Sequence, residues 1–493
     1  MKSRRAEGKS IFFQFRFLTS FLPTLIALTP NDAHGAPPGM QRHSKLRDNP
    51  RAIAVDILNR VDRSRAFAEP LLDRVLSGNG VEDPADRSLL TQIVYGTLRM
   101  RNRLDWILGN LYEGDFESLE GTLKNILRVG LYQITCLDRI PHYAAVDEAV
   151  ELTRSVRPGR EALINALLRN AIRKSRTMAF PDYDRDPALH IAVLHSHPLW
   201  LVKRWIGLFG PERTMALCRV DNDPPPVGLR TNTLKTSRRE VLEELRAEGL
   251  RAEATAYSPD GVSLSPGFAR PLRELEPFRR GHLHVQDEAS QLIAYLVNPQ
   301  GGMRVADLCC GAGGKTTHMA ARMGNRGAIL AMDRNAGQIR ALRANARRLG
   351  VRIIEARCGD VSRLSRTAAY GPCDRVLLDA PCSGLGTLRR NPEIKWRLTE
   401  MDLSVFPPLQ LRLLKEASTC VKSGGVLVYS TCTIMPEEND HVIESFLRSH
   451  RDFQLAAPPD TIPREMIGQD GVFRSDPHLH GTDGFYGAVL WKG

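Results

Sequence analysis

A chain of 493 residues, of which 42% are hydrophobic, is long enough for about three globular domains with cores of their own. The formal net charge of +12 indicates an anionic partner, with nucleic acid as the first expectation, although a basic protein with no polyanion to bind would have the same composition. Nine cysteines, an odd number scattered along the chain without C-x-x-C spacing, argue against a disulfide framework and a zinc site, and favour a reducing compartment.

Residues 1–47 resemble a secretory signal peptide. Three basic residues near the start precede an apolar stretch from Phe17 to Leu28, and small residues from Ala33 to Ala36 follow. Export would separate the protein from the cofactor inferred below. We therefore favour Met40 as the true start and expect a cytoplasmic protein, since no other stretch is long and apolar enough to span a membrane.

Residues 48–180 are predicted to form an all-helical bundle. Apolar residues recur at helical spacing, and breaks around residues 78–80, 114, 141 and 158–159 separate the helices. The bundle holds no evident catalytic group. Basic side chains are expected on its surface, where solvated helix faces explain them as well as RNA binding does: Arg87, Arg99, Arg101, Arg103 and Lys124.

Residues 181–285 begin with a predicted helix over 197–218, which a break at Asp223-Pro224-Pro225-Pro226 ends. A strand from Val227, a helix over 239–248 and short strands up to 283–285 follow. This order predicts a small α/β unit of the kind that presents a sheet to RNA. Arg230 and Lys235 flank its first strand, where phosphate contact and a plain structural role fit equally well.

Residues 286–493 alternate between predicted strands and helices. Strands are expected at 305–308, 328–333, 352–356, 376–379, 426–430 and 485–491, with helices between them that include 336–349 and 409–421. The pattern predicts a doubly wound, Rossmann-like α/β domain.

The first of these strands runs into the glycine-rich stretch Asp307-Leu308-Cys309-Cys310-Gly311-Ala312-Gly313-Gly314-Lys315-Thr316. Glycines between a strand and a helix let the backbone approach a ligand closely. Asp333 ends the second strand about twenty residues later, where an acid suits a ribose diol, and Asp360 follows the third, near an adenine edge. These acids favour an adenosyl cofactor without a pyrophosphate. A nicotinamide dinucleotide would fit the topology but leave two thiols unexplained.

Those two thiols follow consecutive strands. Asp379-Ala380-Pro381-Cys382-Ser383-Gly384 ends one strand and Cys432 ends the next. Ligands gather at the carboxyl ends of strands in open α/β sheets. Carbon 5 of a pyrimidine becomes nucleophilic only after a thiolate adds to carbon 6, while an acid stabilises the ring nitrogen and a base removes the proton from carbon 5. Either cysteine alone fits a buried structural role. Together with Asp379 they favour methylation of carbon 5.

The motifs resemble those of the Nol1/Nop2/Sun family of RNA 5-methylcytosine methyltransferases, most closely the bacterial Sun type, from about residue 48 to the end. The stretches that carry the resemblance are 379–384, Ser430-Thr431-Cys432-Thr433, Pro436-Glu437-Glu438-Asn439, Gln286-Asp287-Glu288-Ala289-Ser290 and Asp483-Gly484-Phe485-Tyr486. The helical part is similar to the NusB antitermination factor at Val94-Tyr95-Gly96-Thr97-Leu98-Arg99, Ile140-Pro141-His142 and Asn165-Ala166-Leu167-Leu168-Arg169.

The resemblance implies that S-adenosylmethionine is the cofactor. The residues implied to bind it are Cys309, Cys310, Gly311, Ala312, Gly313, Gly314, Lys315, Asp333, Asp360 and Asp379. It further implies that Cys432 is the nucleophile and that Cys382 assists release of the product. Asp379 is expected at the ring nitrogen, and a helix starting at Pro436 is expected to favour the Cys432 thiolate. The chain departs from the family pattern where Cys310, Gly311 and Ala312 replace Ala-Ala-Pro.

The implied substrate is RNA, most specifically a cytosine of small-subunit ribosomal RNA that is unpaired or flipped out of its stack. We expect a monomer that needs no metal and no membrane. Two alternatives remain open: the same chemistry on transfer RNA, and an RNA-binding assembly factor whose catalytic domain is vestigial.

Overall fold

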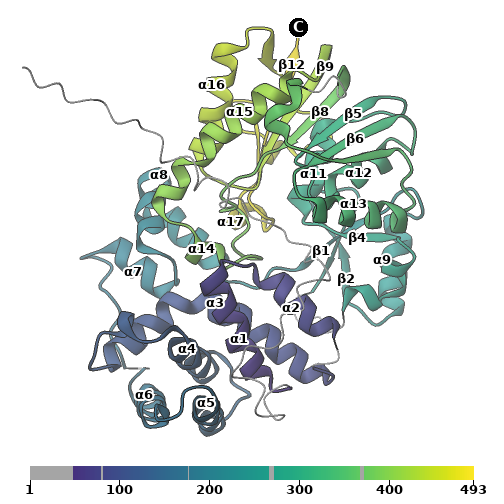
Figure 1. Ribbon diagram of the computed structural model, residues 1–493. Coiled ribbons are helices and arrows are strands. Elements are labelled where there is room, and N and C mark those ends of the chain that lie inside the picture. Colours follow the sequence, from purple (N-terminus) through teal and green to yellow (C-terminus); the bar gives the residue numbers. More distant parts are fainter. Residues whose placement is uncertain (1–47, 79–80, 176, 266–270, 367–370) are drawn as a thin grey trace, which may run out of the picture.

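The computed structural model describes residues 48–78, 81–175, 177–265, 271–366 and 371–493. The signal-like stretch and the expected start at Met40 lie outside these ranges. The described residues form a helical bundle, a small four-stranded unit and a larger α/β domain (Figure 1). The larger domain starts at residue 286 and contains the predicted catalytic residues, and is hereafter the catalytic domain. None of their helices is both long and apolar enough to cross a membrane.

The bundle consists of six α-helices whose apolar faces share one core. They are α1 (Pro50–Ser64), α2 (Ala68–Ser77), α3 (Pro84–Leu111), α4 (Gly121–Cys136), α5 (His142–Val156) and α6 (Glu161–Lys174). Asn49 caps α1 by accepting hydrogen bonds from two backbone amides of its first turn, and Asp83 caps α3 in front of Pro84. The predicted all-helical bundle is confirmed.

The basic side chains expected on the surface of the bundle are only partly exposed, and one of the five, Lys124, is buried. Lys124 is buried and donates to Glu117, and Arg101 pairs with Asp62. Arg99 donates through Nη2 to the Arg389 carbonyl oxygen, 2.9 Å away in the catalytic domain. These contacts give the cations structural partners within the protein.

A connecting pair of helices, α7 (Pro187–Leu194) and α8 (Leu199–Val220), leads to the small unit. Its antiparallel sheet has the order β2-β3-β1-β4. The elements are β1 (Val227–Thr231), α9 (Arg238–Ala247), β2 (Ala252–Ala254), β3 (Gly261–Leu264), α10 (Glu276–Arg279) and β4 (Leu283–Val285). Side chains alternate along β1, so Leu229 packs with Val241 and Leu245 of α9, while Arg230 points to the other face.

That other face packs on the catalytic domain at Arg230. The guanidinium of Arg230 is 1% exposed and donates to Gln286, the Gly314 carbonyl oxygen and Thr317. The Lys235 ammonium likewise donates to the carbonyl oxygens of Arg280 and Arg348. Of the two roles left open for this pair, the structural one applies, and the sheet does not present Arg230 to RNA.

The catalytic domain contains the sheet β10-β12-β9-β8-β5-β6-β7, with β11 paired to β12. Strands β5 to β9 are parallel, whereas β12 and β10 are antiparallel to their neighbours. The strands are β5 (Arg304–Leu308), β6 (Ala328–Asp333), β7 (Ile354–Cys358), β8 (Cys373–Asp379), β9 (Val421–Thr431), β10 (Phe453–Leu455), β11 (Phe473–Arg474) and β12 (Tyr486–Lys492). The predicted Rossmann-like class is confirmed, and the third strand begins two residues later than predicted.

Helices cover both faces of this sheet (Figure 1). The helices are α11 (Glu288–Val297), α12 (Gly314–Arg322), α13 (Ala336–Leu349), α14 (Ile394–Arg397), α15 (Phe406–Ser418), α16 (Asp440–Ser449) and α17 (Pro477–His480). Because side chains alternate along a strand, Leu378 and Leu427 share a core with α15 and α16, while Leu377 and Val428 share one with α11, α12 and α13. A sheet buried on both faces leaves only its edges and strand ends for chemistry.

One segment, residues 389–397 and hereafter the docking segment, connects the catalytic domain to the bundle. Lys395 is fully buried, and its Nζ donates to the carbonyl oxygens of Arg99 and Ser196 and to Asn222 Oδ1, at 2.9 to 3.1 Å. The Trp396 indole N–H donates to the Leu98 carbonyl oxygen at 2.7 Å. The docking segment follows the Cys382 motif in sequence, so the bundle is anchored close to the predicted site.

Candidate functional site

The predicted site residues lie at the carboxyl ends of the parallel strands. Strand order reverses between β5 and β8, because β5 is followed by β6 on one side and paired with β8 on the other. Such a switch point is where α/β sheets hold ligands. Figure 1 shows these strand ends facing the small unit and the bundle.

The cofactor loop, residues 309–315, turns sharply from β5 into α12. Cys309, Gly311 and Gly313 have positive φ angles of 65°, 54° and 83°. A Cβ at Gly313 would lie 1.9 Å from Leu342 Cδ1, so this position requires glycine, whereas nothing lies within 4 Å of a Cβ at Gly311. The loop is thus packed on α13 at one glycine and open at the other.

Asp333 holds this loop from the end of β6. One carboxylate oxygen accepts from the Gly311 amide at 3.0 Å and the other from the Asn335 amide at 2.8 Å. Asp360 follows β7 and accepts from the Ser362 amide, with its side chain about half exposed. The two acids therefore lie on neighbouring strands, but only Asp333 contacts the cofactor loop.

Asp307 was not among the predicted site residues, although it lies directly under the cofactor loop. Its side chain is fully buried, Oδ2 accepts from the Thr316 hydroxyl at 2.6 Å, and Oδ1 has no hydrogen-bond partner. Burial raises the pKa of Asp307 to about 7. Its position in the sequence could have indicated a site residue, because Asp307 is the second-last residue of β5, just before the glycines of the cofactor loop.

Asp379 and Lys315 form an ion pair between β8 and α12. Lys315 Nζ lies 2.7 Å from Asp379 Oδ2, and the Ser430 hydroxyl donates to Oδ1 at 2.7 Å. Burial alone would lower the pKa of Lys315, but the adjacent carboxylate outweighs it and the pKa is raised. The Phe485 ring lies 5.0 Å from the same ammonium. The Lys315 ammonium therefore stays charged at neutral pH.

The two predicted cysteines are brought together. Cys382 Sγ lies 3.3 Å from Cys432 Sγ, although fifty residues separate them in sequence. Cys382 is buried, whereas Cys432 is half-buried. The hydrogen bond with Cys432, together with burial, raises the pKa of Cys382 well above its ordinary value. Cys382 is therefore a thiol at neutral pH, and Cys432 is the more accessible of the two sulfurs.

The expected helix start at Pro436 is wrong. Residues Pro436–Glu438 form a single 3-10 turn, and α16 begins only at Asp440. Asn439 interrupts the helix with φ −114° and ψ −93°, and its side chain bonds Thr431 Oγ1 and the Thr433 carbonyl oxygen instead. A helix N-terminus directly after Cys432 consequently does not contribute to its thiolate.

The loop before β12, which contains Gly484, contacts the loop that follows Cys382. Gly386 donates to the Cys432 carbonyl oxygen at 3.0 Å, and Gly484 donates to the Gly386 carbonyl oxygen at 2.7 Å. A Cβ at Gly386 would lie 2.0 Å from the Gly484 carbonyl oxygen, so the backbones touch. The motif around residues 483–486 thus lies beside both cysteine motifs.

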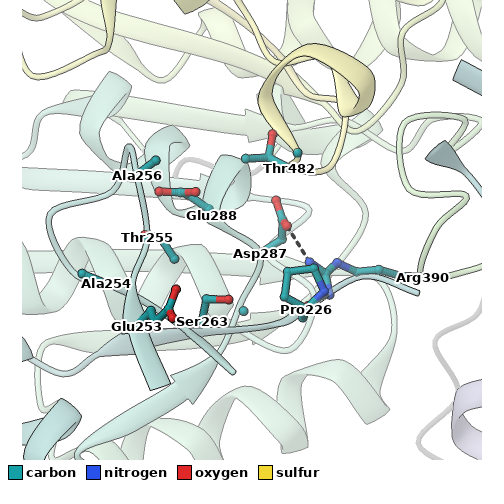
Figure 2. A pocket seen from close by; sticks show the side chains of 12 residues that line it. Pro226, Glu253, Ala254, Thr255, Ala256, Ser263, Asp287, Glu288, Arg390 and Thr482 are labelled. Atoms are coloured by element: carbon teal, nitrogen blue, oxygen red, sulfur yellow. Dashed lines mark hydrogen bonds and ion pairs between the residues drawn. The ribbon is translucent and has the colours of Figure 1, made fainter. Parts of the chain in front are cut away.

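A separate cavity of about 210 Å³ lies where the small sheet, α11 and the loop at 481–482 meet. Figure 2 shows its lining, with Asp287 joined to Arg390. Arg390 Nη2 donates to Asp287 Oδ2 at 2.7 Å, and its Nε to Asp483 at about 3.0 Å. None of the predicted site residues lines this cavity.

Comparison with known proteins identifies the family of this chain. Three family models match: the NusB family over residues 48–173, the ferredoxin-like domain of RsmF/B-like methyltransferases over 197–269, and 16S rRNA methyltransferase RsmB/F over 294–491. The probable ribosomal RNA small subunit methyltransferase B of Bacillus subtilis (strain 168) is 35% identical over 446 residues, covering 88% of this chain and 97% of the relative. The chain belongs to the 16S rRNA methyltransferase RsmB/F family.

Other members and solved structures agree with the RsmB/F assignment. The ribosomal RNA small subunit methyltransferase B of Pseudomonas syringae pv. tomato is 34% identical over 456 residues, covering 90% of this chain and 97% of that one. The crystal structure of PH0851 matches with a TM-score of 0.77 and 27% identity, covering 93% and 99% of the two chains. NSun6 from Pyrococcus horikoshii with SFG matches with a TM-score of 0.56 and 25% identity, covering 61% and 99%. The predicted resemblance and the RNA methyltransferase class are confirmed.

The arrangement of Asp333 leads to a prediction about cofactor affinity. Asp333→Ala removes a charged acceptor from the expected ribose position and frees the Gly311 amide, so S-adenosylmethionine should bind more weakly by about 1–3 kcal/mol. Isothermal calorimetry measures this loss. Glu355→Ala, in the exposed part of the neighbouring strand β7, is the matched control and should bind as the unaltered protein does. Unchanged affinity in Asp333→Ala would assign the ribose to another carboxylate.

Proposed function

We propose that this chain transfers a methyl group from S-adenosylmethionine to carbon 5 of a cytosine in small-subunit ribosomal RNA, through a covalent adduct at carbon 6. The observation that carries the proposal is the 3.3 Å separation of the Cys382 and Cys432 sulfurs beside the Asp379–Lys315 pair. A methyltransferase that acted on an already nucleophilic atom would need neither thiol.

The cofactor loop fits an adenosyl cofactor. Space is open above Gly311, and the buried Oδ1 of Asp307 lacks a partner, as expected beside a ligand that donates a hydrogen bond. We assign binding to residues 309–315 with Asp333, Asp360 and Asp379. The NSun6 neighbour was solved with SFG, an analogue of S-adenosylmethionine, which supports this assignment. When bound, this cofactor supplies the methyl group.

The other chemical roles in the reaction are assigned to residues of the chain. The Cys432 thiolate forms a bond to carbon 6, and the electron pair displaced from the 5,6 double bond makes carbon 5 nucleophilic. Asp379, held between Lys315 and Ser430, is assigned to the ring nitrogen, to which its carboxyl group donates a proton as that nitrogen takes up charge. After a base removes the proton from carbon 5, the carbon–sulfur bond breaks and the double bond reforms. Cys382 lies next to the departing sulfur and assists this release.

The experiment that tests the function compares two RNAs as methyl acceptors. Purified protein with radiolabelled S-adenosylmethionine should label small-subunit ribosomal RNA stripped of proteins, and nuclease digestion with mass spectrometry should recover 5-methylcytidine. Labelling of transfer RNA alone would assign the same chemistry to that substrate. No labelling of either RNA, with cofactor bound, would favour the assembly-factor alternative. The cytoplasmic location and the monomeric state belong to this proposal.

RNA binding should depend steeply on salt. Each phosphate neutralised by Lys or Arg releases counterions, so a net charge of +12 predicts loss of affinity with added salt. Between 50 and 200 mM salt we expect at least about a tenfold loss, the change for roughly three phosphate contacts on single-stranded RNA. Fluorescence anisotropy with a labelled RNA measures it. A dissociation constant independent of salt would contradict electrostatic binding.

A further inference from the structure

Glu438 lies between the loops that carry the two cysteines. Its side chain is 0% exposed, and it is the last residue of the 3-10 turn that replaces the expected helix start. It contacts neither sulfur directly among the hydrogen bonds of the described residues. It contacts instead Ser383 and Thr433, the residues that directly follow Cys382 and Cys432.

On the Cys382 side, Glu438 accepts two hydrogen bonds at one oxygen. The Ser383 amide donates to Oε2 at 2.8 Å, and Gln410 Nε2 donates to the same oxygen at 2.9 Å. Gln410 Nε2 also donates to the Pro381 carbonyl oxygen at 3.0 Å. The residues before and after Cys382 are therefore both connected to this carboxylate.

On the Cys432 side, the Thr433 hydroxyl reaches the other oxygen. Thr433 Oγ1 lies 3.3 Å from Glu438 Oε1 and 2.8 Å from the Ser383 hydroxyl. The Tyr429 hydroxyl, on the strand that leads to Cys432, donates to the Glu438 main-chain oxygen at 2.6 Å. One buried residue thus connects the loops after β8 and after β9.

We propose that Glu438 is a positioning residue that sets the distance between the Cys382 and Cys432 sulfurs. The Gly386 amide also connects the two loops through the Cys432 carbonyl oxygen, but Glu438 is the side chain that contacts the residue next to each sulfur. A displacement of about 1 Å is enough to cost about a hundredfold in rate. Burial raises the pKa of Glu438, while the hydrogen bonds from Ser383, Gln410 and Thr433 oppose that rise. The inference rests on the proposed function for the roles of the two thiols, but the distance itself is testable without RNA.

The test is the rate at which diamide oxidises the two thiols to a disulfide in the full-length protein. Cys382 and Cys432 lose two protons and two electrons to the azo group, which becomes a hydrazine. Alkylation stops the reaction, and mass spectrometry identifies the linked peptides. Glu438→Ala should form this disulfide at least about tenfold more slowly, because the separation is no longer fixed. Glu438→Gln keeps an oxygen for the Ser383 amide and should react nearly as the unaltered protein does. Glu444→Ala, on the exposed side of α16, is the matched control.

Two results would overturn the proposal: an unchanged disulfide rate in Glu438→Ala, or equal slowing in Glu438→Gln, which would assign the effect to charge. If circular dichroism shows Glu438→Ala unfolded, Thr433→Val decides, since it removes the hydroxyl through which the Cys432 loop reaches Glu438 and Ser383. An unchanged disulfide rate in Thr433→Val also overturns the proposal. In methyl transfer, kcat of Glu438→Ala should fall by about 10- to 100-fold with KM for RNA nearly unchanged. A protein that shows the disulfide effects but methylates no RNA would refute the proposed function and leave the positioning role in place.

Discussion

Cys432→Ala is expected to abolish methylation and form no covalent adduct, whereas Cys382→Ala should accumulate RNA attached to protein. Only the half-buried Cys432 sulfur is open to an incoming base, while Cys382 is buried against it and held as a thiol. Loss of a covalent nucleophile costs about 10⁴-fold or more in comparable enzymes. Cys382→Ala should still attack and transfer the methyl group, then stall before the carbon–sulfur bond breaks.

A denaturing gel with labelled RNA separates the free RNA from the adduct, and the released 5-methylcytidine measures turnover. Cys420→Ala, which alters a buried cysteine between α15 and β9, is the control and should behave as the unaltered protein does. An adduct in Cys432→Ala together with none in Cys382→Ala would make Cys382 the nucleophile.

Lys395→Met is expected to uncouple the bundle from the catalytic domain. The ammonium donates to acceptors from three segments, of which the contact with the Ser196 carbonyl oxygen is fully buried. Burial lowers the pKa of Lys395, and the nearby Asp221 carboxylate opposes that fall. A buried acceptor left without a partner costs about 1–3 kcal/mol, so the loss should be at least about 1 kcal/mol. Methionine keeps most of the volume, which confines the change to the polar contacts.

Differential scanning calorimetry tests this expectation. The unaltered protein should unfold with the bundle and the catalytic domain coupled, and Lys395→Met should show an additional, earlier transition. Lys415→Met, on the exposed side of α15, removes the same charge without a buried partner and should leave the profile unchanged. If Lys395→Met showed no additional transition and the same unfolding temperature as the unaltered protein, apolar packing alone would hold the domains together.

The elements and motifs that depend on local sequence were predictable. Short apolar runs ending in an acid or glycine predicted β5, β6 and β8, because a buried parallel strand and the loop after it are both encoded within a few residues. The candidate site followed for the same reason, since Asp333, Asp379 and both cysteines lie at strand ends. The Pro436 error also has a local cause: the φ angle that proline fixes fits the first turn of a 3-10 helix as well as that of an α-helix.

What could not be predicted depends on contacts between distant segments. The sequence fitted phosphate contact and a structural role equally well for Arg230, and only the approach of Gly314 and Thr317 makes it an internal donor. Glu438 appeared as one acid in a motif, and its connection of two loops emerges only when β8 and β9 pair. Cationic side chains carry no sequence mark that separates a solvated position from one that another domain covers.

The docking segment also sets an order of events during synthesis. Trp396 and its acceptor Leu98 are 298 residues apart, which at about 5–20 residues per second is roughly 15–60 s of translation. The bundle has its own core and completes it early, but the surface around Leu98 and Arg99 waits for residues 389–397. The bundle and the catalytic domain can therefore dock only after the Cys382 motif has been synthesised. Removing the bundle would expose Lys395 and Trp396 to water, because their acceptors Arg99 and Leu98 would be lost. The helical domain is therefore structurally required by the catalytic domain.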